Sequence, residues 1–259
     1  MRVAITGGAS GIGKACVNLF LAKGWDVTVL GRTQPTQNDV NFISLDLGDE
    51  SSISSAIDEL SGKFDAVISN AGLPPTQGIE TDIFAVNLLG FRRLYRAFES
   101  RMNKGGAFVN VASRAGHDWQ NNLDQVQAVL ALESRAEISE FVARHKLSAI
   151  DCYRLSKAAV IAYTIQETER FAQIGLRANC VSPAATETSM LGSFLGSKVG
   201  VIEKNIARIG RAGQPEECTQ VISFLASSES SWVKGVNIPV DGGLSAMLLS
   251  DSFGTSSQY

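Results

Sequence analysis

The sequence has few of the residues that stabilise secreted or metal-dependent proteins. Only four cysteines occur among 259 residues, and no two of them form a Cys-x-x-Cys pair. Widely spaced cysteines of this kind are typical of reduced, buried thiols in a cytoplasmic protein. The two histidines have no second ligand nearby in the sequence, so no metal site is expected. The cysteines are Cys16, Cys152, Cys180 and Cys218, and the histidines are His117 and His145.

Long apolar runs and an excess of positive charge are also missing. No run of about eighteen apolar residues is present, which predicts that no segment spans a membrane. A strand-like run begins at Arg2 and leaves no room for a signal peptide, so we expect a cytoplasmic protein. The formal net charge of −3 argues against a nucleic-acid partner. With 44% hydrophobic and 19% charged residues and no linker or repeat, the whole chain, 1–259, is predicted to form one domain.

The N-terminal stretch has the features of a phosphate-binding turn. Residues 2–6 form a β-branched apolar strand, residues 7–13 are rich in glycine, and a helix is predicted over about 12–23. Glycine lets the backbone approach a pyrophosphate closely, and the helix N-terminus offers free N–H groups. The Walker pattern G-x-x-x-x-G-K also fits from Gly8, but Ala15 stands where that pattern needs a Ser or Thr for Mg²⁺. The sequence therefore favours a dinucleotide site over a P-loop.

The end of the second predicted strand bears on the choice of nucleotide. This strand covers residues 27–30 and is followed by Gly31 and Arg32. In dinucleotide-binding folds an acid at this point accepts hydrogen bonds from the ribose 2′-hydroxyl, whereas an arginine accommodates a 2′-phosphate. Because Gly31 replaces the acid and Arg32 supplies a guanidinium, we predict a preference for NADP(H), with NAD(H) as the alternative.

The rest of the chain alternates between buried strands and helices. Further strands are predicted at 42–45, 66–69, 107–111, 177–181 and 236–240, and helices at about 50–61, 80–102, 152–173 and 215–227. Apolar runs of this kind are typical of parallel strands buried on both faces. We predict an α/β fold, a single-domain Rossmann doubly wound parallel sheet of about seven strands with ligands at the carboxyl ends of the strands. Ser113 follows the fifth strand and is therefore a candidate site residue.

Two segments depart from this alternation. Residues 117–149 have apolar side chains at helical spacing and are predicted to form a helical insertion. Its apolar face requires burial, either in a subunit interface or as a flap over the substrate. Residues of about 184–200 contain Gly192, Gly196 and Gly200 among apolar side chains, which predicts a mobile lid over an apolar or aromatic substrate.

The stretch from Cys152 to Lys157 has the most direct chemical meaning. Tyr153 and Lys157 stand four residues apart on a predicted helix, so their side chains are neighbours on one face. A nearby ammonium favours the phenolate and is expected to lower the pKa of Tyr153 from its ordinary value near ~10. A tyrosine tuned in this way acts as general acid or base on an alcohol or carbonyl. Taken alone, such a pair is more often an ordinary contact on a helix surface.

Together these motifs resemble the short-chain dehydrogenase/reductase family over essentially the whole chain. The long gap between Ser113 and Tyr153 and the run from Val240 to Leu244 are similar to the branch that contains bacterial 3α-hydroxysteroid dehydrogenases/carbonyl reductases and coniferyl alcohol dehydrogenases. That likeness implies a homodimer, with a homotetramer as the alternative. The motifs that carry the resemblance are Thr6-Gly7-x-x-x-Gly11-Ile12-Gly13, Asn70-Ala71-Gly72, Asn87, Ser113, Tyr153-x-x-x-Lys157 and Pro183 to Thr188.

The resemblance implies a role for each matched residue. Tyr153 would exchange a proton with the substrate oxygen, Lys157 would lower its pKa and hold the nicotinamide ribose, and Ser113 would polarise the substrate carbonyl. Asn87 would hold a water that links Lys157 to solvent, and Asp46 would accept a hydrogen bond from adenine. The cofactor-binding residues implied in this way are Gly7, Ser10, Gly11, Ile12, Gly13, Arg32, Asp46, Leu47, Asn70, Ala71, Gly72, Tyr153, Lys157, Pro183, Thr186 and Thr188.

The function that follows is hydride transfer between a nicotinamide cofactor and a small-molecule carbonyl or alcohol. The leading prediction is an enzyme of the carbonyl reductase/hydroxysteroid dehydrogenase type that acts on a hydrophobic ketone or aldehyde. The alternatives are an aromatic primary alcohol dehydrogenase and a non-catalytic dinucleotide-binding regulator. Ala184 departs from the glycine that the family usually has after proline, so the turn there has to avoid positive φ or accept strain.

Overall fold

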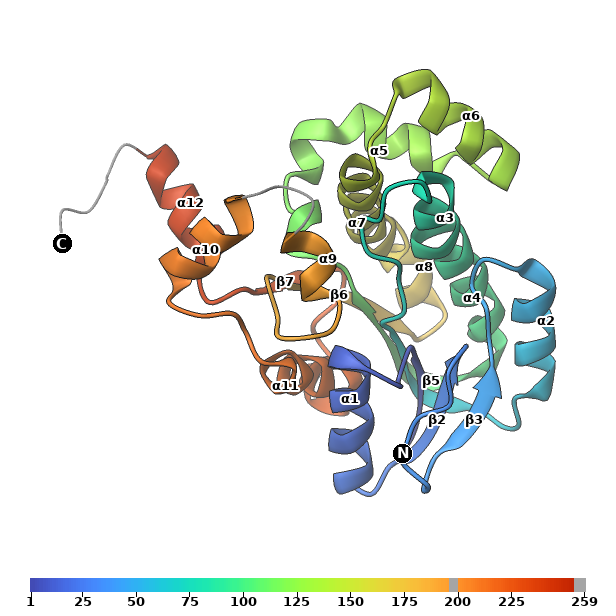
Figure 1. Ribbon diagram of the computed structural model, residues 1–259. Helices are drawn as coiled ribbons and strands as arrows, with labels where there is room; N and C mark the ends of the chain where they lie inside the picture. The colour runs from blue at the N-terminus through green and yellow to red at the C-terminus, as the bar shows by residue number, and fades with distance from the viewer. Residues whose placement is uncertain (196–199, 254–259) are drawn as a thin grey trace.

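In the part of the chain that the structure describes, residues 1–195 and 200–253, seven parallel strands form one sheet (Figure 1). The structure is a computed structural model. The strand order is β3-β2-β1-β4-β5-β6-β7. The strands are β1 (Arg2–Thr6), β2 (Asp26–Gly31), β3 (Asn41–Ser44), β4 (Phe64–Ser69), β5 (Met102–Val111), β6 (Arg177–Pro183) and β7 (Asn237–Val240). The predicted doubly wound parallel sheet is confirmed.

Apolar runs explain why the central strands are buried on both faces. Val3, Ala4 and Ile5 of β1 are fully buried, and every residue of β6 is buried. A parallel strand between two helix layers has no solvated face, so an alternation of apolar and polar residues would bury unpaired polar groups. The strand order places β1 next to β4, where the direction of winding reverses, and ligands bind at such switch points.

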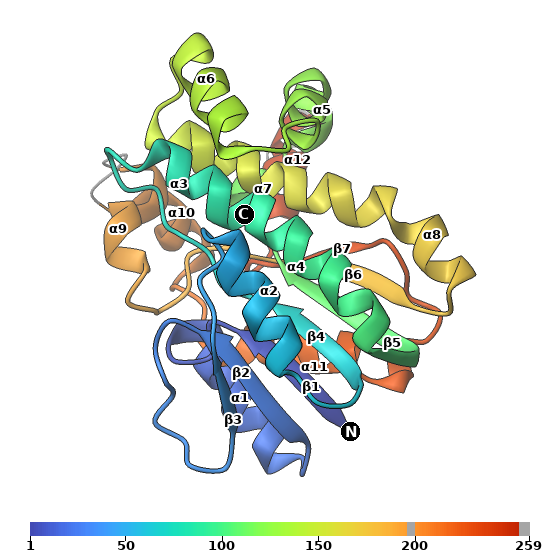
Figure 2. The ribbon, with the colours of Figure 1, turned by 90° about the vertical axis from the view of Figure 1, so that its right-hand side faces the viewer.

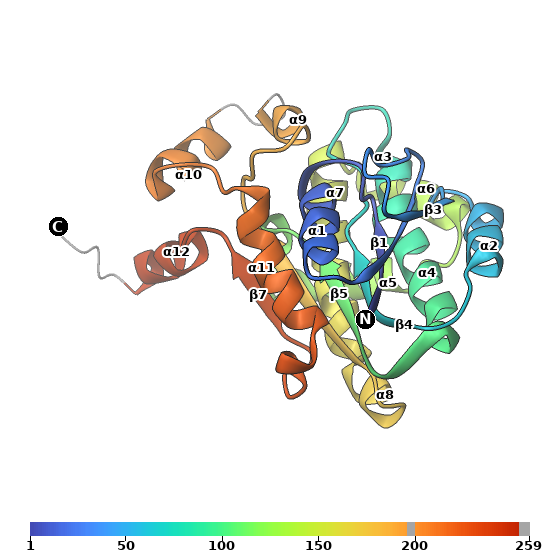
Figure 3. The same cartoon turned by 90° about the horizontal axis from the view of Figure 1, so that it is seen from below.

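Helices cover both faces of the sheet (Figures 2 and 3). Each helix layer shares its own hydrophobic core with one face of the sheet, and β1, β2, β4, β5 and β6 contribute residues to both cores. Aromatic rings fill one of these cores, where Tyr95 stacks on Phe171 with ring centroids 5.0 Å apart. One layer contains α1 (Gly11–Ala22) and α11 (Pro215–Ala226), and the layer with the aromatic core contains α2 (Glu50–Glu59), α4 (Phe91–Phe98), α7 (Ala149–Gln166) and α8 (Thr168–Gln173).

The helix predicted over 80–102 is interrupted around Asn87. The Asn87 side chain bonds outside its own helix: Oδ1 accepts from the Leu73 N–H at 2.7 Å, and Nδ2 donates to the Leu73 carbonyl at 3.0 Å. π-helical turns occur frequently at functional sites, and this one fixes the loop that follows β4. The segment consists of α3 (Glu80–Phe84), a π-helical turn (Ala85–Gly90), α4 and a 3₁₀ turn (Glu99–Arg101), and β5 already begins at Met102.

The C-terminal part contains helices that the apolar pattern did not predict. The prediction that 215–227 is the last helix is wrong, because α12 (Leu244–Ser252) follows β7. Two of these helices were not predicted because each follows a glycine, which in sequence resembles a loop signal. Gly200 has φ 96° and Gly243 has φ 86°, and each directly precedes a helix. Residues 196–199 of the predicted lid lie outside the described residues. The other new helices are α9 (Leu191–Leu195) and α10 (Val201–Ile209), and α7 ends before α8 where one helix was predicted.

No helix in the described ranges has the length and apolar character needed to cross a bilayer. The four cysteines are buried and free, as predicted.

The predicted insertion forms two helices, α5 (Leu123–Leu130) and α6 (Arg135–His145), which pack on α3 and α7 at the outer side of the helix layer (Figure 1). Val126, Val129 and Ile138 are at most 2% exposed, and they share a core with residues of α3 and α7. The chain's own helices therefore bury most of this apolar face, although Leu123 is 43% exposed, and a subunit interface at the insertion stays a prediction.

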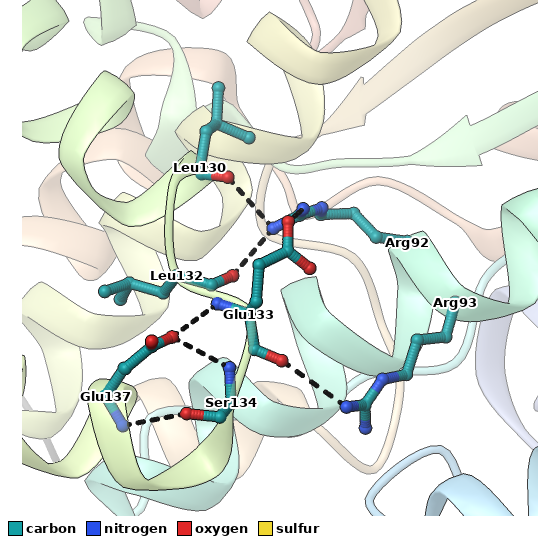
Figure 4. Close-up of polar contacts among 7 residues, drawn as sticks. All are labelled: Arg92, Arg93, Leu130, Leu132, Glu133, Ser134 and Glu137. Atoms are coloured by element: carbon teal, nitrogen blue, oxygen red, sulfur yellow. Dashed lines mark hydrogen bonds and ion pairs between the residues drawn. The ribbon is translucent and has the colours of Figure 1, made fainter.

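A buried arginine fixes the insertion to the helix layer (Figure 4). Arg92 of α4 is 3% exposed, and its Nη1 donates to the carbonyls of Leu130 and Leu132 at 3.0 and 2.9 Å. Its Nη2 forms an ion pair with Glu133. Glu137 in turn accepts from the Glu133 N–H at 2.7 Å and completes the capping box of α6. Because charged donors bind the exposed carbonyls of the α5–α6 turn, the turn is held in one conformation.

Candidate active site

One cavity of about 450 Å³ lies at the carboxyl ends of the central strands. Loops that follow β1 to β6 line it, together with α7, α9 and α10. A cavity of this size at the switch point of a parallel sheet is the expected place for a ligand. Most predicted site residues line it, namely Gly7, Ser10, Gly11, Ile12, Arg32, Asp46, Leu47, Asn70, Ala71, Gly72, Ser113, Tyr153, Lys157, Pro183, Thr186 and Thr188.

The turn between β1 and α1 uses backbone that glycine alone fits well. Gly7 and Gly11 have φ of 70° and 51°, in the left-handed region. Gly13 does not line the cavity, and its role is different: a Cβ there would lie 2.1 Å from the Gly7 carbonyl oxygen. The absence of that side chain lets α1 begin close against the turn. The first N–H groups of α1 are then available to an anion.

The loop after β4 is tied to this turn by hydrogen bonds. Thr6 Oγ1 accepts from the N–H groups of Asn70 and Ala71, each at 3.0 Å. The Asn70 side chain donates to the carbonyls of Thr6 and Gly7 at 3.2 and 3.3 Å. The two loops therefore form one continuous surface, and a change in either of them displaces the other.

Arg32 and Asp46 line the end of the cavity at β2 and β3. Asp46 Oδ1 accepts from the Gly48 N–H at 2.8 Å, which holds its carboxylate in place. Arg32 is exposed, and its guanidinium forms no hydrogen bond or ion pair within the described ranges. With Gly31 at the end of β2 in place of an acid, this end of the cavity has an unpaired positive charge.

Ser113, Tyr153 and Lys157 meet at the other side of the turn. Tyr153 and Lys157 of α7 are 5% and 6% exposed. The hydroxyl groups of Tyr153 and Ser113 share a hydrogen bond, and Ser113 Oγ also accepts from the Ala115 N–H at 3.1 Å. Lys157 Nζ donates to the Val111 carbonyl at 2.9 Å and lies 5.9 Å from the centre of the Tyr153 ring. The structure brings these three predicted residues together, and their catalytic roles stay a prediction.

The pKa of Tyr153 differs from the expectation. Burial raises the pKa of Tyr153 to about 12, and the hydrogen bond with Ser113 opposes this rise only in part. Burial also lowers the pKa of Lys157 to about 8. The prediction that Lys157 lowers the pKa of Tyr153 is therefore wrong in this structure, because burial dominates and the opposing influence comes from Ser113 rather than from Lys157. Tyr153 holds its proton at neutral pH.

Asn87 lies one layer behind the cavity and does not line it. Besides its bonds to Leu73, its Nδ2 donates to Ser156 Oγ at 3.3 Å. A Cβ on Gly72 would lie 3.0 Å from Asn87 Oδ1 and 3.5 Å from Lys157 Nζ, so both polar groups face Gly72. Asn87 thus supports the cavity wall next to Lys157.

The segment after β6 forms the opposite wall. Thr188 packs against the glycine turn, since a Cβ on Gly11 would meet its Cγ2 at 3.1 Å. Ala184 does not have the positive φ that would favour glycine at this position, so its backbone is not strained. Among the described residues other than glycine, only Lys146 has positive φ. The far end of this wall is lined by Ser189, Met190, Leu191, Ile202, Asn205, Ile209 and Leu244, most of which are apolar, as predicted for the substrate side.

Sequence reasoning missed one charged residue of the site. Arg114 follows Ser113 directly and lines the same cavity. The signal that could have found it is its position, because a residue next to the end of a central strand lies near the ligand in such sheets.

Comparisons with known proteins agree with this geometry. Sequence models of two families match, "short chain dehydrogenase" over residues 1–124 and "Enoyl-(Acyl carrier protein) reductase" over residues 133–245. The chain is 31% identical over 249 residues to the coniferyl-alcohol dehydrogenase of Pseudomonas sp. (strain HR199 / DSM 7063), with 95% of this chain and 96% of the relative covered. It is 27% identical over 256 residues to the 3-alpha-hydroxysteroid dehydrogenase/carbonyl reductase of Comamonas testosteroni, with 97% and 99% covered.

A solved structure has the same fold. It is the 3-alpha-hydroxysteroid dehydrogenase from Pseudomonas sp. B-0831 complexed with NADH, which superposes with a TM-score of 0.82 at 29% sequence identity. The superposition covers 96% of this chain and 98% of that one.

Proposed function

Because the chain belongs to the short-chain dehydrogenase/reductase family, we propose that it interconverts a hydrophobic ketone or aldehyde and its alcohol, with NADP(H) as cofactor. The observation that carries this proposal is the meeting of Ser113, Tyr153 and Lys157 beside the glycine turn in one cavity. A substrate bound in this cavity would then lie beside both an acid/base group and a bound dinucleotide.

The residues present fit a dinucleotide. The glycine turn and the start of α1 offer N–H groups for a pyrophosphate, and a Cβ at Gly7 or Gly13 would crowd Ala71 or the Gly7 carbonyl and so displace this turn. Asp46 and Leu47 line the end suited to an adenosine, while Lys157 lies beside the position suited to the nicotinamide ribose. The related 3-alpha-hydroxysteroid dehydrogenase was solved with NADH, which supports a nicotinamide cofactor here.

The protein supplies the proton and the orientation. When bound, the nicotinamide supplies or accepts the hydride. The raised pKa of Tyr153 keeps its hydroxyl protonated at neutral pH, which is the form that donates to a carbonyl oxygen during reduction. Ser113 presents its hydroxyl to the same oxygen and stabilises negative charge there. Asn87 and the π-helical turn hold the loop next to Lys157 and so keep these groups in place.

Arg32 and Gly31 support NADP(H) over NAD(H). Arg32 has no partner in the described ranges and would attract a 2′-phosphate, and Gly31 at the end of β2 supplies no carboxylate to bind a free 2′-hydroxyl. We expect Arg32→Gln to lower kcat/KM with NADPH about 10-fold and to leave kcat/KM with NADH nearly unchanged, since the exposed site is screened by water. Equal losses with both cofactors would contradict this role.

A second substrate class has a specific observation in its favour. The relative at 31% identity is named a coniferyl-alcohol dehydrogenase, so an aromatic primary alcohol and its aldehyde are the alternative to a ketone. The apolar side chains at the far end of the cavity suit either an aromatic or an alicyclic body.

The test is the consumption of NADPH and NADH by the purified protein with ketosteroids, aryl ketones and cinnamyl aldehydes. We expect turnover with at least one class, and we expect Tyr153→Phe to lose about 100–10,000-fold in kcat while it binds the cofactor as the wild type does. Full activity of that variant would contradict the mechanism. Cofactor binding without any turnover would favour a non-catalytic regulator.

A further inference from the structure

Four charged side chains line the main cavity, and one of them has no explanation in the mechanism above. Arg32 and Asp46 lie at the end suited to the adenosine, and Lys157 donates to Val111. The fourth, Arg114, lies directly after Ser113, on the side where the carbonyl has to be bound.

The guanidinium of Arg114 has no partner among the residues that the structure describes. Across residues 1–195 and 200–253 it forms no hydrogen bond or ion pair, and its Nε is buried with no acceptor. Arg92 and Arg177 also leave Nε without an acceptor, but their Nη groups donate to backbone carbonyls, so within the described ranges Arg114 differs from them in having no acceptor for its Nη groups. A donor removed from water without an acceptor costs free energy, so an acceptor that arrives with a ligand would be favoured.

The backbone of Arg114 is also held in place. It begins a 3₁₀ turn (Arg114–Gly116) that lies against α7, and a Cβ on Gly116 would lie 2.5 Å from the Ala158 N–H nitrogen. A turn packed this closely against the helix of Tyr153 and Lys157 presents its side chain from a fixed position.

We propose that Arg114 binds a carboxylate of the substrate, so that the substrate is an oxo acid or hydroxy acid with an apolar body. This inference rests on the proposed function and names its substrate class. A planar guanidinium matches a carboxylate in a bidentate way. A single uncommitted cation on this side balances one negative charge, which favours a carboxylate over a phosphate dianion. The facing wall of Met190, Leu191 and Ile202 is apolar and suits the rest of the molecule.

The experiment compares acids with their methyl esters, which have the same carbonyl and skeleton without the charge. The substrates are para-formylbenzoate, β-benzoylpropionate and the methyl ester of each. The variants are Arg114→Gln and a matched control, Arg154→Gln, which removes the same charge from an exposed position of α7 outside this cavity. We expect the wild type and Arg154→Gln to prefer the acids, and Arg114→Gln to lose about 10–100-fold in kcat/KM for the acids and little for the esters.

Two results would overturn this inference and leave the proposed function standing. In one, the wild type has equal kcat/KM for the esters and the acids. In the other, Arg114→Gln keeps the wild-type preference for the acids. Absence of turnover with every substrate would count against the proposed function instead. In that case a binding experiment decides the inference. Calorimetry compares the binding of benzoate with that of benzamide, which lacks the charge, to protein saturated with oxidised cofactor. Benzoate binding that Arg114→Gln abolishes supports it, and benzoate binding that is absent or unaffected overturns it.

Discussion

The two walls of the main cavity are built in opposite ways. The wall of the glycine turn and the loop after β4 is tightly packed, since a Cβ on Gly7 would lie 3.1 Å from the Ala71 Cα, and a Cβ on Gly13 behind it would lie 2.1 Å from a backbone oxygen. The segment that carries the other wall, from Ser189 onward, is loosely packed: a Cβ on Gly192, next to the lining residue Leu191, would meet nothing within 4 Å, and α10 has no buried residue. Enzymes of one family use the same kind of dinucleotide, whereas their substrates differ, so the two walls meet different demands.

This difference has a parallel among the relatives. Proteins named for coniferyl alcohol and for 3-alpha-hydroxysteroids both match almost the whole chain at 27–31% identity. Under the proposed function, a tightly packed wall for the cofactor combined with an open wall for the substrate would allow the substrate to change while the fold and the acid/base group stay the same. We therefore expect substitutions on the first wall to affect all substrates and those on the second wall to affect selectivity.

The strongest test of this contrast is a pair of glycine-to-alanine variants. We expect Gly13→Ala to weaken cofactor binding about 10–100-fold, because overpacking against the Gly7 carbonyl costs about 1–3 kcal/mol and displaces the turn. Gly192→Ala, in α9, is expected to leave cofactor binding within about twofold and to stabilise the helix slightly. Fluorescence titration of both variants with the cofactor measures the difference.

Folding is the control for this pair. Circular dichroism and urea unfolding show whether Gly13→Ala still reaches the native state, so that lost binding is separated from lost structure. Similar binding by both variants would show that the two walls do not differ in tolerance, and the contrast would fail.

The insertion extends the rigid part of the molecule, and Arg92 is the residue on which this depends. We expect Arg92→Met to lower the free energy of unfolding by about 2–3 kcal/mol, because the carbonyls of Leu130 and Leu132 lose a charged donor. Arg93→Met on the same helix removes a partly exposed ion pair with Glu50 and a long, exposed hydrogen bond of 3.4 Å to the Glu133 carbonyl, and is expected to cost less than about 1 kcal/mol. Urea unfolding at an unchanged m-value measures both, and equal effects would mean that Arg92 is not the anchor.

A smaller effect concerns Tyr153, which lies where the two walls meet. The raised pKa predicts that Tyr153 of the cofactor-free protein ionises near pH 12, above the ordinary value of a tyrosine. The tyrosinate absorbance of the wild type minus that of Tyr153→Phe, followed as pH rises, isolates this residue from the other tyrosines. A midpoint below 10 would instead support the view that Lys157 dominates the pKa.

Much of the fold could be predicted because buried parallel strands leave a strong local pattern. The apolar runs of β1, β4 and β6 identify them directly, and the turn after β1 identifies the ligand side of the sheet. Ser113, Tyr153 and Lys157 could be placed together because strand ends and helix faces follow simple geometry.

What could not be predicted depends on contacts between distant residues. The π-helical turn at Asn87 depends on the backbone of Leu73, fourteen residues earlier. The pKa of Tyr153 depends on burial by the whole fold, which a four-residue spacing does not contain. α10 and α12 follow glycines that resemble loop signals, and Arg114 belongs to no motif.

The most direct test of the central claim is isotope transfer from the reduced cofactor. The protein is incubated with NADPH that carries deuterium at both C4 positions of the nicotinamide and with an aldehyde or ketone that it reduces, and the alcohol is examined by mass spectrometry and NMR. We predict one deuterium at the carbinol carbon with the wild type, and transfer about 100-fold slower or worse with Tyr153→Phe. An alcohol without deuterium, or equal transfer by the variant, would contradict the account.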